Sequence, residues 1–351
     1  MISSSALKRS VVVGLVAAVV ASCKASDSSS LDFAHPLASA ADLDFVPAFA
    51  DEFDDTALDP QKFGAIEGDP VHKNTVNSVS KAQVGFTDGA ILLNAAPTPA
   101  DPVFPYATGY VDTQGLFAQT YGKIEFRARC KYAPGVWYAM WGRAWADLVP
   151  EIDIEFLAEN ITQVWFVNHW ALPPLPADDR RGFTTVNGID ISTFHTYTIV
   201  WGPELLEWQI DGKAYRQVTG ANVPHTPMFW ILNAWVGGWG GDPSPATQFP
   251  ASLEVDYLRV QRLATWQVDP AIRVAKPKPS YGARETIAIE IADFDDGATV
   301  EMREGDRTVA TLAAPPFRFP VAALSHGDHV LTFHATDGSR AASVELAVTI
   351  N

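Results

Sequence analysis

The chain is short of cysteine, of basic side chains and of long helical patterns. Its 351 residues include two cysteines, Cys23 and Cys130, which excludes a disulfide framework, and Cys130 is expected to be a small buried apolar residue. Lys and Arg total 25 against 41 Asp and Glu, and the net charge of −16 argues against nucleic acid or an anionic membrane surface as a partner. No long amphipathic helical pattern occurs, so a helical fold is not expected.

The longest apolar run near the N-terminus, residues 11–20, is too short to span a bilayer as a helix. It follows a basic segment and ends in Val20-Ala21-Ser22-Cys23, which resembles a bacterial lipobox with cleavage before Cys23 and lipid added to its sulfur. We expect residues 1–22 to be a lipoprotein-type signal peptide and 23–44 a flexible tether to the outer membrane. An ordinary secretory signal peptide and a secreted protein are the alternative.

Residues 45–263 consist of short alternating or apolar runs separated by Gly, Pro, Asp and Asn, a pattern typical of strands and turns. Asp211-Gly212, after one such run, is a strong hairpin signal. We therefore predict one large all-β sandwich here. Residues 264–284 contain three prolines and are predicted to be a linker, and the strand patterns of residues 285–351 resemble a small immunoglobulin-like β-sandwich.

The most unusual stretch is Glu151-Ile152-Asp153-Ile154-Glu155-Phe156, in which acidic and apolar side chains alternate strictly. Period 2 predicts a half-buried strand with the three carboxylates on one face. Like charges close together on a sheet destabilise it, so the row needs a reason. The alternatives are a solvated acidic face and a catalytic one.

The spacing of the two glutamates favours catalysis. A strand rises about 3.3 Å per residue, so the Cα atoms of Glu151 and Glu155 lie roughly 13 Å apart, and their carboxyl groups can lean to about 5–6 Å. Retaining glycosidases hold their two carboxyl groups roughly 5–5.5 Å apart. Asp153 lies between them, where its negative charge favours the protonated form of a neighbour.

Aromatic residues gather around this stretch. Of the 11 tryptophans, ten lie between Trp137 and Trp239, and flat rings suit stacking on sugars as well as core packing. Trp137 and Trp145 are our candidates for the walls of a cleft. On the strand expected next, His169 and Asn168 are candidates for sugar contacts. Because neighbouring residues of a regular strand face opposite sides, both can reach the cleft only if that strand is bulged.

Several segments in order make residues 45–263 resemble glycoside hydrolase family 16, the concanavalin-like β-jelly-roll endoglucanases. The segments are Asp51-Glu52-Phe53-Asp54, residues 121–129, residues 135–141, the acidic row itself, Leu232-Asn233 with Gly237-Gly238, and residues 255–260. The resemblance implies that Glu151 is the nucleophile, Glu155 the general acid/base and Asp153 the assisting carboxylate, in cleavage that retains anomeric configuration.

The resemblance leaves the substrate open. The unbulged row is most similar to lichenases, which implies endo-hydrolysis of mixed-linkage β-1,3-1,4-glucan; transglycosylation on xyloglucan or a related β-glucan, and non-catalytic glycan binding at the cell surface, are the alternatives. No cofactor is expected to be required. A structural calcium is a possibility to which Asp256 or the acidic turn of residues 293–297 would contribute. The expected partner is a polysaccharide, and the protein is expected to be a monomer.

Overall fold

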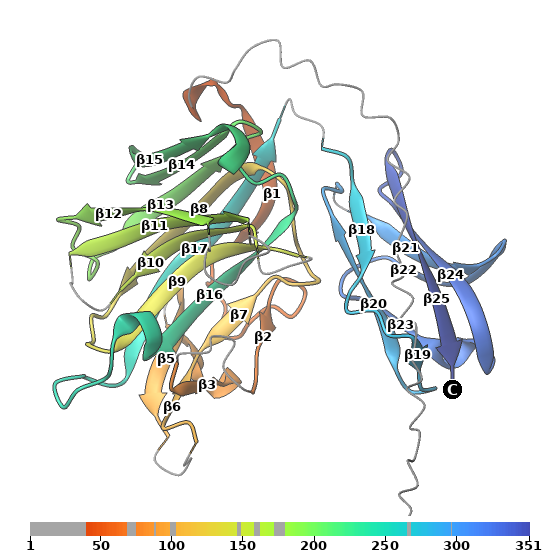
Figure 1. Cartoon of the computed structure of the whole chain (residues 1–351), viewed down its shortest axis with the longest axis horizontal. Helices are drawn as coiled ribbons and strands as arrows, with labels where there is room; N and C mark the ends of the chain where they lie inside the picture. Colours follow the sequence, from red (N-terminus) through yellow and green to blue (C-terminus); the bar gives the residue numbers. More distant parts are fainter. Residues whose placement is uncertain are drawn as a thin grey trace, which may run out of the picture. The chain divides into compact units, whose positions relative to one another are not determined.

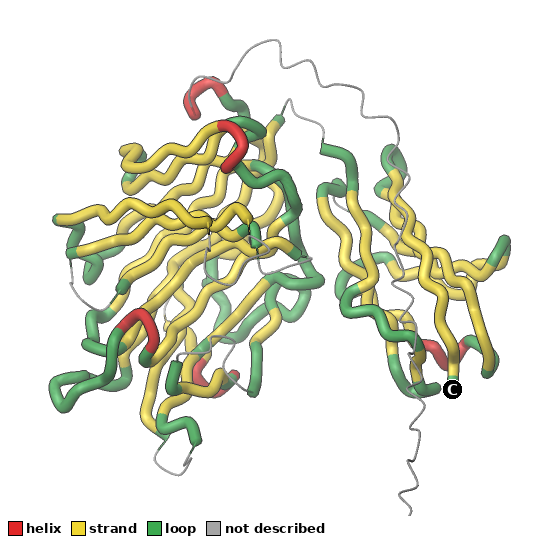
Figure 2. Tube along the Cα trace, viewed as in Figure 1, coloured by secondary structure: helices red, strands yellow, loops and turns green. Residues whose placement is uncertain are grey.

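The computed structural model describes residues 40–351 except 69–74, 88, 99–102, 146–148, 158–161, 172–179, 265–267 and 296. The predicted signal peptide, the lipidation site Cys23 and most of the tether therefore lie outside the described residues and stay predictions. Figure 2 shows that strands dominate the described chain. Within it, the helices are 3-10 turns of three residues: η1 (Ala40–Asp42), η2 (Lys81–Gln83), η3 (Gly220–Asn222), η4 (Gly238–Gly240) and η5 (Val321–Ala323). None of the described helices is long and apolar enough to cross a membrane.

The first sandwich, residues 45–263, has two sheets (Figure 1). Its larger sheet contains β1 (Phe45–Asp51), β3 (Asn77–Val79), β4 (Val84–Thr87), β5 (Ala90–Pro97), β6 (Tyr106–Thr108), β8 (Gly122–Cys130), β13 (His195–Trp201), β14 (Leu205–Ile210), β15 (Lys213–Thr219) and β17 (Ala251–Leu263). The other sheet runs in the order β12 (Arg180–Asn187), β11 (Gln163–Ala171), β10 (Glu151–Phe156), β9 (Val136–Ala144), β16 (Met228–Val236), β7 (Tyr110–Asp112) and β2 (Gly64–Ala65). The predicted bounds of this domain coincide with the start of β1 and the end of β17.

Alternation along the strands builds the core between these sheets. In β8 every second residue is buried, and Ile124, Phe126 and Ala128 are completely covered. From the smaller sheet, Ile154 and Leu232 enter the same cluster. Cys130 is 2% exposed in it, so its prediction as a buried apolar residue is confirmed.

The predicted hairpin after β14 is confirmed. Asp211 and Gly212 form the two-residue link between β14 and β15, with φ values of 50° and 77°. Both residues need positive φ in a turn of this kind, which Asp tolerates and Gly adopts freely. The turn starts the pairing of β14 with β15, and a register shift between Trp208 and Gln209 then places Arg216 opposite Trp208.

The second sandwich has its own core and two small sheets. One is β18 (Ala271–Val274), β20 (Thr286–Ala292) and β23 (Phe317–Pro320); the other is β19 (Ser280–Tyr281), β25 (Ala341–Ile350), β24 (Gly327–Thr336), β21 (Thr299–Glu304) and β22 (Arg307–Leu312). The predicted linker 264–284 is therefore wrong in part, because β18 pairs with β20 and β19 with β25. The prolines flank these short strands instead of interrupting them, as edge positions allow. The immunoglobulin-like assignment stays a prediction.

Candidate active site

The acidic row forms strand β10, in the smaller sheet of the first sandwich, as its period predicted. Ile152, Ile154 and Phe156 are at most 1% exposed and belong to the core. Glu151, Asp153 and Glu155 alternate with them and lie on the other side, which we call the carboxylate face of the sheet. The strand therefore turns its hydrophobic half to the sandwich and its acidic half away from it.

The register of β10 with its two neighbours defines three rows on the carboxylate face. Glu151 pairs with Arg143 of β9 and His169 of β11. Asp153 pairs with Trp141 and Val167. The third row joins Ala139 of β9, Glu155 and Trp165 of β11. The two glutamates thus have different surroundings: a guanidinium and an imidazole beside Glu151, a methyl group and an indole beside Glu155.

Two of the three carboxylates are withdrawn from water. Asp153 is 3% exposed and Glu155 8%, whereas the side chain of Glu151 is 24% exposed. Burying a carboxylate costs free energy unless it is paired, so apolar residues at these positions would give a more stable sheet. Two buried carboxylates two residues apart on one strand, with a more exposed third, are an arrangement typical of functional sites.

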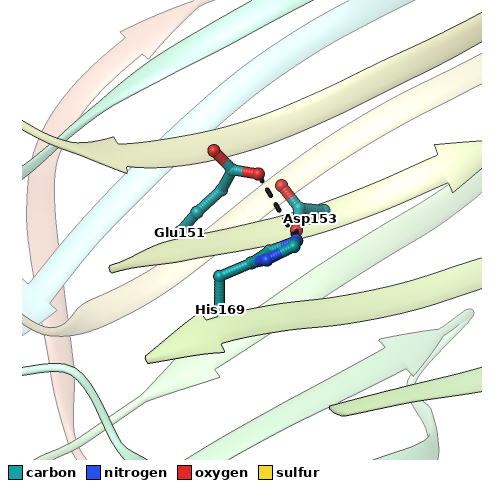
Figure 3. Close-up of side chains that lie close together, drawn as sticks. All are labelled: Glu151, Asp153 and His169. Atoms are coloured by element: carbon teal, nitrogen blue, oxygen red, sulfur yellow. Dashed lines mark ion pairs between the residues drawn. The ribbon is translucent and has the colours of Figure 1, made fainter. Parts of the chain in front are cut away.

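His169 lies over the acidic row (Figure 3). Its Nε2 atom is 3.6 Å from Glu151 Oε1 and 3.6 Å from Asp153 Oδ2. These distances are too long for hydrogen bonds but short enough for attraction when the ring is protonated. The structure thus places His169 on the face where the sequence expected it. Ligand atoms of these three side chains lie within 4.8 Å of one another, a donor set that could also hold a divalent cation.

The prediction that Asn168 binds a sugar is wrong. Asn168 is fully buried on the opposite face of β11, because that strand is regular where it pairs with β10. Its Oδ1 atom accepts a hydrogen bond of 2.6 Å from Arg216 Nη2 of β15. Asn168 therefore joins the two sheets from within the sandwich.

A support behind the acidic row was not predicted. Trp208 of β14 donates from Nε1 to the backbone carbonyl of Asp153 at 3.0 Å. The guanidinium of Arg216 lies over the Trp208 ring, 5.2 Å from its centroid, and donates to Thr184 Oγ1 of β12 at 3.2 Å. Gly142, beside Ile152 on β9, leaves room for the Trp230 ring, which a Cβ atom would approach to 2.5 Å. These contacts hold the middle of β10 from beneath.

The predicted tryptophan walls are only partly as expected. Trp137 and Trp141 share the carboxylate face, as the alternation of β9 predicted. Trp137 itself is only 4% exposed, with Nε1 donating to Gly237 O at 2.9 Å, so it is wrong as an open wall. Trp239 of η4 stacks on it at 6.4 Å between ring centroids and presents the exposed ring instead. Trp145 follows β9 and is half-buried, so its role stays a prediction.

A further buried acid, Asp112 of β7, lies three strands from β10 on this face. It pairs with Ile231 of β16, which pairs with Trp141 of β9. Burial raises the pKa of Asp112 to about 7 against the hydrogen bond that its carboxylate accepts from Gln114 N. Sequence reasoning did not single out Asp112, because one acid at a strand end has no local signal.

A β-sandwich with such a carboxylate row on one sheet agrees with the jelly-roll architecture that the sequence resemblance implies. The chain belongs to the glycosyl hydrolases family 16, whose profile matches residues 73–259. The family expected from the sequence is therefore confirmed.

Named relatives are similar over the same region. The chain is 28% identical to endo-1,3-1,4-beta-glycanase ExsH of Rhizobium meliloti over 52% of its own length and 40% of that protein. It is 30% identical to a beta-glucanase of Rhodothermus marinus over 61% of this chain and 84% of that one. A laminarinase catalytic domain of Thermotoga petrophila has a TM-score of 0.57 at 26% identity, covering 64% of this chain and 100% of that domain. The chain thus spans less than half the length of ExsH.

Proposed function

We propose that residues 45–263 form an endo-acting glycoside hydrolase that cleaves β-glucan with retention of configuration. The observation that carries this proposal is the row Glu151, Asp153 and Glu155 on one face of β10, two of them buried. The family membership supports it, as does the similarity to relatives named as an endo-1,3-1,4-beta-glycanase and a beta-glucanase. Mixed-linkage β-1,3-1,4-glucan is the proposed substrate, by similarity to the relatives named for that linkage.

The proposed mechanism has two displacements. In the first, the protonated carboxyl of Glu155 gives its proton to the glycosidic oxygen while the Glu151 carboxylate attacks the anomeric carbon; the C–O bond breaks and a glycosyl ester forms. In the second, the Glu155 carboxylate takes a proton from water, and the resulting hydroxide attacks the anomeric carbon and frees Glu151. Asp153, held through its backbone by Trp208, adds negative charge beside both carboxyl groups.

The different neighbours of the two glutamates suit these roles. Arg143 and His169 flank Glu151 and favour its charged form. Ala139 and Trp165 flank Glu155, which is mostly buried, and apolar surroundings favour a protonated carboxyl. The assignment of nucleophile to Glu151 and proton donor to Glu155 is therefore the one that the surroundings favour.

Role-specific variants test the proposal. Wild type should release reducing ends from lichenan more readily than from laminarin, xyloglucan or agarose, with the β-anomer detected first by NMR. Glu151→Ala should lose this activity by about 10³-fold or more and yield an α-glycosyl azide with added azide. Glu155→Ala should lose it on glucan yet keep the first step on aryl glycosides whose leaving group needs no proton.

Glu125→Ala is the matched control, since Glu125 lies on the solvent side of β8 in an ion pair with Lys123 at 2.7 Å. It should leave turnover unchanged. Glucan binding without turnover by wild type would favour a non-catalytic glycan-binding protein, and products longer than the substrate with an added acceptor would favour transglycosylation. Undiminished activity in either glutamate variant would contradict the site.

A further inference from the structure

Phe183 of β12 is the most exposed aromatic side chain in the described part of the chain, at 53%. Most phenylalanines here are buried or half-buried, and Phe carries no polar atom that profits from water. An exposed ring of this kind contributes little to folding. Its neighbours in the sheet therefore indicate what kind of ligand the exposed ring could contact.

The register places Phe183 on the carboxylate face. Val167 of β11 pairs with Phe183 on one side and with Asp153 on the other. The ring stacks on Trp165, with centroids 5.2 Å apart and planes at 26°. Trp165 is in turn the cross-strand partner of Glu155. A continuous aromatic surface thus runs from the proposed proton donor to the exposed edge at Phe183.

Trp165, the ring on which Phe183 stacks, is held in place by hydrogen bonds. Trp165 Nε1 donates to Gln163 Oε1 at 3.0 Å, which orients the indole along β11. Gln163 is also held, because its Nε2 donates to Asn187 Oδ1 of β12 at 3.0 Å. A ring stacked on such a support loses little conformational freedom when a ligand covers it.

We propose that Phe183, supported by Trp165, is a stacking platform for a pyranose ring of the glycan, on the leaving-group side of the scissile bond. One face of a β-linked glucosyl unit is lined by C–H groups, which match an apolar ring that has no hydrogen-bonding atom. The leaving-group side follows because Trp165, the support of the platform, is the cross-strand neighbour of Glu155, which is proposed to protonate the leaving oxygen. The inference rests on the proposed function.

The test compares Phe183→Ala on two substrates. On a β-glucan oligosaccharide, kcat/KM should fall about 3- to 10-fold, because stacking of a flat ring is lost. On an aryl glycoside, whose leaving group is not a sugar, kcat/KM should stay within twofold. Transfer to an added sugar acceptor should fall together with the oligosaccharide value, since the acceptor occupies the same side. Phe183→Trp should restore both.

Phe194→Ala is the matched control. Phe194 lies against Arg127 and Arg129 on the other sheet, with the guanidinium carbons 4.5 Å and 4.4 Å from its ring centroid. It should leave the ratio of the two substrates unchanged. Equal losses of Phe183→Ala on both substrates, or no loss on either, would overturn the platform while leaving the proposed hydrolysis intact.

Retardation in native gels containing lichenan separates the platform from the proposed function. If wild type turns over neither substrate, the hydrolase proposal fails. The binding of lichenan in the gel then tests the Phe183 platform by itself. Weaker retardation of Phe183→Ala than of Phe194→Ala then supports a sugar platform, and equal retardation overturns it.

Discussion

The two sandwiches both bury charged side chains, but they treat them differently. In the second, Glu290 is 6% exposed and accepts a hydrogen bond of 2.6 Å from Arg273 on the adjacent strand. His329, 8% exposed, lies 2.6 Å from Glu304 through Nδ1. In the first, Asp153 and Glu155 share one strand face with Glu151. Buried side chains of opposite charge stabilise each other. Buried acids next to one another instead have perturbed pKa values, which are common at functional sites.

This difference teaches where function lies. The sequences of both regions alternate with period 2, and both have closed apolar cores. Among the strands that the structure describes, β10 is the one whose polar half carries three acids in succession, and two of the three are buried. Neighbouring acids on a sheet are normally avoided because they destabilise it. Such an exception is typical of functional sites.

The largest expected effects come from the same substitution, Glu to Gln, made at a buried glutamate of each sandwich. Glu155→Gln should lower glucan turnover by about 10²- to 10⁴-fold and leave the free energy of unfolding nearly unchanged, because a neutral amide replaces a carboxyl that is proposed to be protonated. Glu290→Gln should leave turnover unchanged and lower the free energy of unfolding by about 2–4 kcal/mol, because Arg273 loses its carboxylate. Urea unfolding and initial rates measure the two quantities.

The two residues are a fair pair, since their exposures are 8% and 6%. If Glu155→Gln destabilised the chain as strongly as Glu290→Gln, Glu155 would belong to a structural network. Lost turnover in Glu290→Gln would remove the division between the two sandwiches.

A smaller effect is expected at Asn168, and it tests whether Asn168 lies on the core side of β11. Asn168→Ala should lower the free energy of unfolding by about 1.5–3 kcal/mol, because it leaves Arg216 Nη2 without this acceptor. The Michaelis constant for lichenan should not change. His169→Ala, one residue along on the carboxylate face, should instead raise the Michaelis constant for lichenan and leave the free energy of unfolding nearly unchanged. A raised Michaelis constant at unchanged stability in Asn168→Ala would return Asn168 to the sugar-binding surface.

The smallest effect concerns pH and Asp112. Its pKa is raised to about 7, chiefly by burial, so between about pH 4 and 7 the folded chain holds a proton that the unfolded chain has released. Its contribution to stability therefore falls as pH rises through that window and is level above it. Asp112→Asn stays neutral, so its stability relative to wild type should rise between about pH 4 and pH 7 and then stay level up to pH 8. Melting temperatures across pH measure this, and a difference independent of pH would contradict the buried proton.

The sequence by itself determined the strands and the acidic row. Strict alternation in residues 151–156 is a local property, since adjacent side chains of any strand point to opposite sides. Asp211-Gly212 likewise sets its turn by backbone preference alone. Family-wide segments made the jelly roll predictable, and the family profile matches residues 73–259 within it.

Tertiary structure decided which of two faces is covered, and by what. Asn168 and His169 are equally polar in sequence, and only the register of β11 against β10 sends one into the sandwich and the other to the carboxylates. Trp137 is covered because the chain returns at η4 and lays Trp239 on it. Trp208 reaches the backbone of Asp153 from the other sheet, and Phe183 meets Trp165 because β12 pairs with β11. Local patterns carry alternation, but burial and contact depend on partners that only the folded chain brings together.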